Sequence, residues 1–197
     1  MHPVPNEVPE PIPFASDTQA RPYDAQAVER FHGALLRMLP VFEHFRTSFL
    51  GKVSPVHLFW GSFDLALTRF SGRRAPLHPG GFPALPDTVT REAYSHEVSS
   101  AGFFAGGGGI EEAMFYSYAY PEPPGFRDSK VEPAEAYFHE PLGEFLLPYA
   151  AVQAAADPSA TLLGFLQSTY EAAATSANWD RAALECALGT PCVPRTP

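Results

Sequence analysis

The first clear pattern in the chain is an apolar stripe with helical spacing that follows residue 24. Its members recur at alternating steps of three and four residues: Val28, Phe31, Leu35, Met38, Phe42, Phe45 and Phe49. This spacing predicts one continuous face of an α-helix, and Asp24 is suited to cap its N-terminus. Pro40 lies off the stripe, and we expect it to kink or break the helix because proline has no N–H to donate.

From residue 55 onward the pattern changes to alternation with a period of two, which is typical of β-strands. The five predicted strands span residues 56–60, 63–70, 93–104, 114–120 and 144–147. The first two are joined by Gly61-Ser62, the spacing of a tight hairpin. Two stretches rich in proline and glycine, 71–90 and 121–143, are predicted to be long loops.

Helical patterns return after residue 149, with Asp157-Pro158 as a strong start signal for the longest of them. The order of these elements, a helix, then strands, then further helices, predicts an α+β fold with a largely antiparallel five-stranded sheet packed on one face by helices. We divide the chain into a Pro-rich extended arm (1–23), a single α+β domain (24–188) and a frayed tail (189–197).

The charge of the chain narrows the classes of partner. Its formal net charge is −9, from 13 basic and 22 acidic residues, and the longest basic run is Arg73-Arg74. Nucleic acids and anionic membrane surfaces need clustered basic residues, so we expect neither as a partner. No apolar run is long enough to span a membrane. The chain has two cysteines and no pattern of a secretory signal at its start, which favours a cytoplasmic protein with reduced thiols.

Polar side chains within the apolar strands are the candidates for chemistry. Strand alternation places Asp64 on one face and Arg69 on the other, and it gives further polar positions on the third and fourth strands. The candidate catalytic residues are His96, Glu97 and His57. The candidate ligand-binding residues are Arg69, Asp64, Tyr116 and Tyr118. In this interpretation His96 or Glu97 is a general base in a Tyr-lined pocket, and Arg69 holds an anionic substrate.

Two other interpretations of these residues stay open. An arginine–carboxylate pair could instead tie strands together. His57 and His96 could also bind a divalent metal with Asp64 or Glu144, because imidazole and carboxylate are suitable ligands. No local metal-binding spacing supports the second alternative, so we predict no metal site. The sequence does not identify a cofactor, so whether the protein binds one stays open.

Long segments of the chain resemble a bacterial family of unknown function, DUF5996. The resemblance is carried by SPVHLFWGSFDLALTRFSGRRAP, EAYSHEVSSAGFF, FYSYAYPEPPGF, EFLLPY, FLQSTYEAAA and WDRAALE. It extends over most of residues 5–188, and the chain looks like the C-terminal two-thirds of the family's usual length. The resemblance implies no reaction, cofactor or catalytic residue. If further strands precede this segment, an exposed sheet edge could pair with a second copy of the chain.

Two hypotheses of function follow from the residues. The first is a small-molecule-binding protein or enzyme, with a His/Arg/Tyr-lined pocket on the sheet. The second is a non-catalytic scaffold or protein-interaction module, in which the same residues hold the sheet together. The sequence does not identify a reaction or substrate.

Overall fold

The computed structural model describes residues 12–82, 85–107, 109–187, 189 and 193–194. In chain order the elements are α1 (Ala25–Arg46), β1 (His57–Phe59), β2 (Asp64–Arg74), α2 (Asp87–Ala93), β3 (His96–Phe104), β4 (Met114–Tyr120), β5 (Tyr137–His139), β6 (Glu144–Pro148), α3 (Tyr149–Ala154), α4 (Pro158–Ser176) and α5 (Arg181–Leu184). Residues 12–23, the described part of the predicted arm, form no helix or strand. Most of the predicted tail, with Cys192, lies outside the described residues. Within the described part of the chain, no helix is both long and apolar enough to cross a membrane.

The predicted α+β fold is confirmed. The strands form one sheet in the order β1-β2-β3-β4-β6-β5, and every pairing in it is antiparallel. The sheet has six strands rather than five, because β5 lies within the stretch 121–143 that we predicted to be a loop. A strand of three residues is too short to show alternation, so its pairing with β6 is not visible in the sequence.

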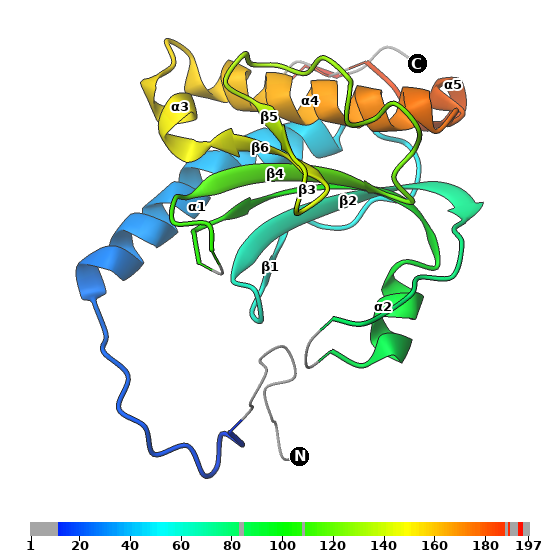
Figure 1. Ribbon diagram of the computed structural model, residues 1–197. Helices are drawn as coiled ribbons and strands as arrows, with labels where there is room; N and C mark the ends of the chain where they lie inside the picture. The colour runs from blue at the N-terminus through cyan, green and yellow to red at the C-terminus, as the bar shows by residue number, and fades with distance from the viewer. Residues whose placement is uncertain (1–11, 83–84, 108, 188, 190–192, 195–197) are drawn as a thin grey trace.

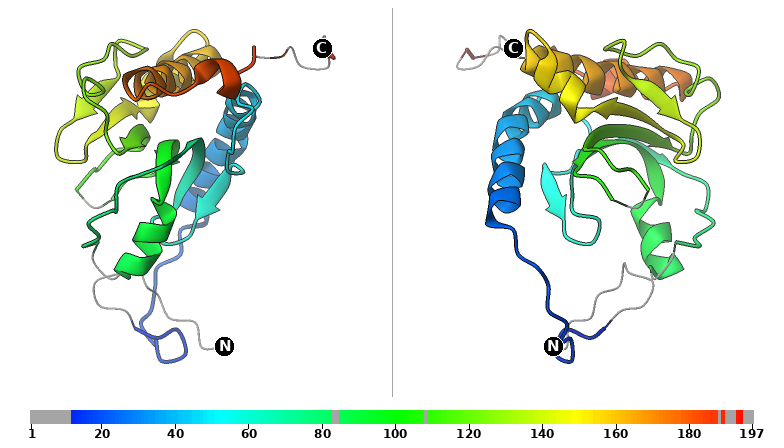
Figure 2. Two further views of the ribbon diagram at one scale, coloured as in Figure 1. Left: turned by 90° about the vertical axis from the view of Figure 1, so that its right-hand side faces the viewer. Right: turned by 60° about the vertical axis from the view of Figure 1, so that its left-hand side comes forward.

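One face of the sheet is covered by helices and carries the core. Figures 1 and 2 show α1 and α4 lying together against the same side of the sheet. The strand side chains that point to this side are buried and mostly apolar: Leu65, Leu67, Ala101, Phe103, Phe115, Phe145 and Leu147. Phe42 and Phe45 of α1 and Phe165 and Leu166 of α4 pack against them. We refer to the opposite face as the open face, because α2, at one end, is the only helix of the described residues on that side (Figure 1). Several of its strand residues are nevertheless buried by neighbouring side chains, among them Ala66, Val98 and Leu146.

Helix α1 begins as the sequence predicts but does not break at proline. The Asp24 carboxylate accepts hydrogen bonds from the backbone N–H groups of Gln26 (2.9 Å) and Ala27 (3.0 Å). The helix then continues through Pro40 to Arg46, so the prediction of a break is wrong. Pro40 leaves the carbonyl group of Leu36 without its helical donor. Leu36 is an exposed residue, so water can satisfy that carbonyl group.

The connection between β2 and β3 is more ordered than the predicted loop. Strand β2 extends to Arg74, and the short helix α2 occupies residues 87–93. Strand β3 therefore begins at His96 rather than at residue 93. The apolar residues of α2 are too few to give a helical period, so the sequence signal is dominated by the surrounding prolines and glycines.

Candidate ligand-binding site on the open face of the sheet

The open face of the sheet holds a group of polar side chains in its centre. Asp64 starts β2, Tyr116 and Tyr118 lie on β4, and Glu144 starts β6. The pairing register opposes Tyr116 to Gly102 of β3 on one side and to Leu146 of β6 on the other. Because alternate residues share a face, Glu144 lies on the same face as Leu146 and Tyr116. Residues that are far apart in the chain are thus brought together by strand pairing.

Gly102 allows this arrangement. A Cβ atom at this position would lie 2.4 Å from the hydroxyl oxygen of Tyr116 and 2.4 Å from its ring. Without that atom, the Tyr116 ring lies across β3 and its hydroxyl group reaches β2, where it donates a hydrogen bond to Oδ2 of Asp64. The Ser62 hydroxyl donates to Oδ1 of the same carboxylate. Asp64 is therefore a buried acceptor whose two oxygens are both engaged.

Glu144 differs from Asp64 because its carboxyl group has no hydrogen-bond or ion-pair partner among the described residues. The residue is partly buried, and burial raises its pKa from 4.5 to about 7, with a further contribution from the charge of Asp64. A carboxyl group with a pKa near neutrality can accept or donate a proton under physiological conditions. It is the acidic residue on this face with the properties expected of a functional group.

Both Asp64 and Glu144 line a cavity of about 360 Å³ on the open face. Its other lining residues are Ser62, Phe104, Gly107, Ile110, Met114, Tyr116, Tyr118, Leu142 and Leu146. The volume falls at the lower end of the range for small-molecule sites, roughly 300–1,000 Å³. Apolar walls with a few convergent polar groups are also typical of such sites.

Beside the cavity, a series of hydroxyl groups crosses the sheet. The phenol of Tyr118 shares a hydrogen bond of 2.9 Å with the phenol of Tyr94, which follows α2. Ser100 on β3 interacts with Tyr118 and lies 2.8 Å, oxygen to oxygen, from the hydroxyl group of Thr68. Burial raises the pKa values of Tyr116 and Tyr118, so both phenols stay protonated. The cavity therefore has two uncharged phenols beside its carboxyl groups, and the phenol of Tyr116 donates to Asp64.

Arg69 lies on the opposite, helix-covered face, which the alternation of β2 predicts. Its guanidinium carbon lies 3.5 Å from the ring centroid of Phe45 and 4.3 Å from that of Tyr170. One terminal nitrogen donates to the carbonyl oxygen of Phe45 and to the Ser48 hydroxyl (3.0 Å), while Nε and Nη1 have no partner. Burial lowers its pKa to about 10. A ligand in the cavity cannot contact Arg69, which belongs to the core.

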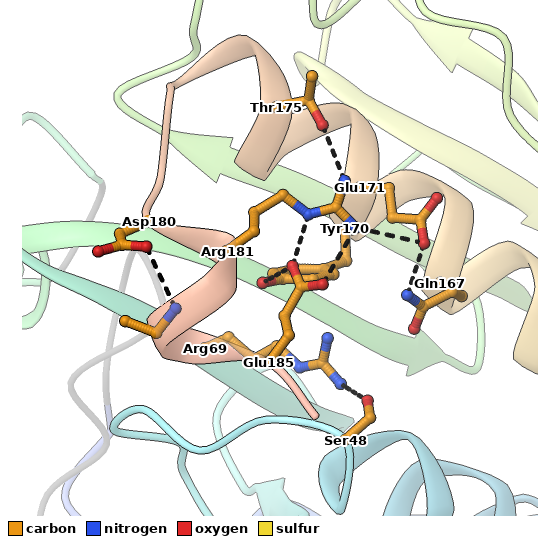
Figure 3. A network of polar contacts seen from close by, with 10 residues as sticks. Ser48, Arg69, Gln167, Tyr170, Glu171, Thr175, Asp180, Arg181 and Glu185 are labelled. Carbon is orange, nitrogen blue, oxygen red and sulfur yellow. Dashed lines mark hydrogen bonds and ion pairs between the residues drawn. The ribbon is translucent and has the colours of Figure 1, made fainter. Parts of the chain in front are cut away.

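Figure 3 shows what surrounds Arg69. The Tyr170 hydroxyl donates to Glu185 (2.8 Å), and Glu185 also accepts from Arg181 (2.6 Å). These contacts join α4 to α5 beside the buried guanidinium group. The network is a packing and charge arrangement that holds the C-terminal helices to the sheet.

The predicted catalytic residues do not converge on the cavity. His57 and His96 share the open face. His57 pairs with Ala66, and Ala66 pairs with Gly102 of β3, which lies six residues from His96. At about 3.3 Å per residue, that separation along the strand is roughly 20 Å. The two histidines therefore cannot bind one metal ion, as the metal alternative required. No three His, Cys, Asp or Glu side chains in the described ranges are placed to hold a metal.

Glu97 has a structural environment. Its carboxylate accepts hydrogen bonds from Arg73 at 2.7 and 3.0 Å and from Ser71 at 2.9 Å. Arg73 also donates to the carbonyl oxygen of Ala177, at the end of α4. This is the strand-tying arrangement that the sequence left open as the alternative to catalysis.

Comparison with known proteins identifies the family. The model of a family of unknown function, DUF5996, matches residues 1–186. The chain belongs to the DUF5996 family. No curated protein and no solved structure matches it.

Within this DUF5996 chain, three of the predicted site residues, Asp64, Tyr116 and Tyr118, line one cavity, and the other four do not line it. Glu144 is the residue whose importance the sequence analysis missed, since it entered there only as an alternative metal ligand. Its place on the open face follows from alternation in β6. Its proximity to Asp64 does not, because β6 pairs with β4 while β5 lies between them in the chain.

Proposed function

We propose that this DUF5996 protein is a small-molecule-binding protein or enzyme whose ligand occupies the cavity on the open face of the sheet. The observation that carries the proposal is Glu144, whose carboxyl group has no partner in the described part of the chain and which lines the same cavity as Asp64. Burying such a group is unfavourable to folding. Contact with a ligand would explain why Glu144 is retained at this position, because functional groups are often kept although they lower the stability of the protein.

The chemistry available to the cavity is proton transfer. Glu144, with a pKa of about 7, exchanges a proton near neutral pH. Asp64, held by Tyr116 and Ser62, is a fixed acceptor, and the Tyr118 phenol, which shares a hydrogen bond with Tyr94, stays uncharged. If the protein is an enzyme, Glu144 is the general acid or base and the other three position the substrate. His57, His96 and Arg69 have no part in this site.

The alternative, a non-catalytic scaffold, is supported by the hairpin between β1 and β2. Phe59, Trp60 and Phe63 are exposed there, with Trp60 87 % exposed. Exposed aromatic residues are typical of protein-interaction surfaces. A cytoplasmic location and a bacterial source are also proposals, which rest on the composition of the chain and on the family resemblance. Pairing with a second copy would use the edge strands β1 or β5.

The function can be tested by retention of small molecules. The protein is mixed with a metabolite extract and separated by gel filtration, and retained compounds are identified by mass spectrometry. Leu142 lines the cavity and is 51 % exposed, so Leu142→Trp should fill its entrance without disturbing the core. Leu50→Trp is the matched control, since Leu50 is exposed and does not line the cavity.

We expect the wild-type protein and Leu50→Trp to retain the same compounds and Leu142→Trp to lose them. Equal retention by all three proteins would place binding outside the cavity. No retained compound in any of them would favour the scaffold.

A further inference from the structure

The charged side chains that line the cavity are all acidic. Among the described residues that line it, Asp64 and Glu144 are acidic and none is Lys, Arg or His. The two carboxyl groups are close enough for the charge of Asp64 to affect the ionisation of Glu144. A negatively charged ligand would place a further like charge beside them, which is unfavourable in a partly desolvated site. The cavity therefore suits a ligand that is neutral or positively charged.

The other walls favour a positive charge attached to an apolar body. Tyr116 and Tyr118 have nearly parallel rings, with centroids 6.2 Å apart and an interplanar angle of 18°. The faces of such rings attract cations. The remaining large residues of the wall are apolar: Phe104, Ile110, Met114, Leu142 and Leu146. They would contact hydrocarbon rather than hydroxyl groups.

We infer that the ligand is a small amine with an apolar body, whose ammonium group lies against Glu144; this inference rests on the proposed function. Asp64 already accepts from Tyr116 and Ser62, whereas Glu144 has no donor from the protein. An ammonium group supplies both the N–H donors and the positive charge that this carboxylate lacks. A neutral hydroxyl group supplies a donor only. The amine is therefore the better complement to the site.

Binding of such a cation should be linked to ionisation of Glu144. The groups that face Glu144 are His139 of β5, which is its partner in the strand register, Tyr116 and Tyr118 of β4, Asp64 of β2 and Tyr94 after α2. Burial raises the pKa values of these three tyrosines, so they stay protonated and uncharged near neutral pH. A cation favours the ionised form of Glu144. Its affinity should therefore rise as the pH increases from 5.5 to 8.

Three probes of similar size separate charge from shape: phenethylamine, 2-phenylethanol and phenylacetate. Phenethylamine stays protonated and phenylacetate stays ionised over this pH range. Affinities are measured by calorimetry at pH 5.5 and pH 8, and the site is located by NMR signals of Gly107 and Tyr116. At pH 8 we expect the amine to bind about tenfold more tightly than the alcohol, and phenylacetate most weakly. The preference should decrease at pH 5.5 and in Glu144→Gln.

Each other outcome overturns the inference. If 2-phenylethanol or phenylacetate binds as tightly as the amine and moves the same signals, the ligand is not selected by positive charge, but the cavity remains a small-molecule site. If the preference for the amine persists unchanged in Glu144→Gln, the ammonium group does not lie against Glu144. If no probe moves the signals at millimolar concentration, the amine is rejected. The retention experiment, which does not depend on ligand charge, then decides the proposed function separately.

Discussion

Replacing Glu144 by glutamine should make the protein more stable at alkaline pH. In the folded protein the carboxyl group has a pKa of about 7, against an ordinary value of 4.5. A tenfold change in proton affinity is worth about 1.4 kcal/mol, so the difference corresponds to at most about 3.5 kcal/mol. Below pH 4.5 both the folded and unfolded forms are protonated, and no penalty exists. Above pH 7 both are ionised, and the folded state carries the whole penalty.

The free energy of unfolding of the wild-type protein should therefore fall as the pH rises from about 4.5 to about 7, whereas a glutamine at position 144 stays neutral and causes no such loss. Urea unfolding at pH 5 and pH 8, followed by the fluorescence of buried Trp179, measures the effect. We expect Glu144→Gln to gain about 2 kcal/mol more, relative to wild type, at pH 8 than at pH 5. Glu135→Gln, the same change at an exposed position without a side-chain partner in the described residues, is the control.

A variant that is equally or less stable than wild type at pH 8 would refute the reasoning. It would mean that Glu144 is held by stabilising contacts in the folded state, as the scaffold hypothesis requires.

Substitutions at two further residues, Arg69 and Tyr116, test the two faces of the sheet. Arg69→Ala should lower the free energy of unfolding by about 3 kcal/mol because it empties a packed site in the core. Arg69→Met keeps most of the volume and removes a buried charge with two nitrogens that lack hydrogen-bond partners, so its free energy of unfolding should stay within about 1 kcal/mol of wild type. Urea unfolding measures both variants, and an equal loss in the two would show that the charge itself stabilises the core. Tyr116→Phe should lower the free energy of unfolding by about 2 kcal/mol at pH 7, because Asp64 stays buried and loses a hydrogen-bond donor. The control is Tyr137→Phe, which changes a half-exposed phenol. Equal stability of the two variants would show that the hydrogen bond to Asp64 contributes little.

Local patterns in the sequence predict most of the fold. The stripe from Val28 to Phe45 and the Asp24 cap define α1, and alternation in β2 separates Asp64 from Arg69. These signals are strong because each repeats over several residues of one element. Pro40 was misjudged because the cost of a proline depends on whether the freed carbonyl group meets water, which a sequence pattern does not contain.

Sequence patterns do not show which of the candidate residues lie close together in the site. Alternation assigns each residue to a face, but it gives no position along the sheet. His57 and His96 share a face and still lie far apart, while Glu144 and Asp64 line one cavity because β4 lies between β6 and β3. That order depends on pairing between segments distant in the chain. The short strand β5, which forms the edge of the sheet next to β6, leaves almost no signal.

Gly102 fixes the identity of one position of the sheet while its neighbour across the strand pair stays free to vary. Any side chain at position 102 would collide with the Tyr116 phenol and also with the backbone oxygen of Leu65, which cannot rotate away. A smaller residue at position 116 relieves only the first collision, so the backbone contact excludes larger residues from position 102 while β2 and β3 keep this pairing. Efforts to redesign the pocket should therefore keep the glycine and vary position 116, and natural relatives should keep glycine at 102 whichever residue they carry at 116.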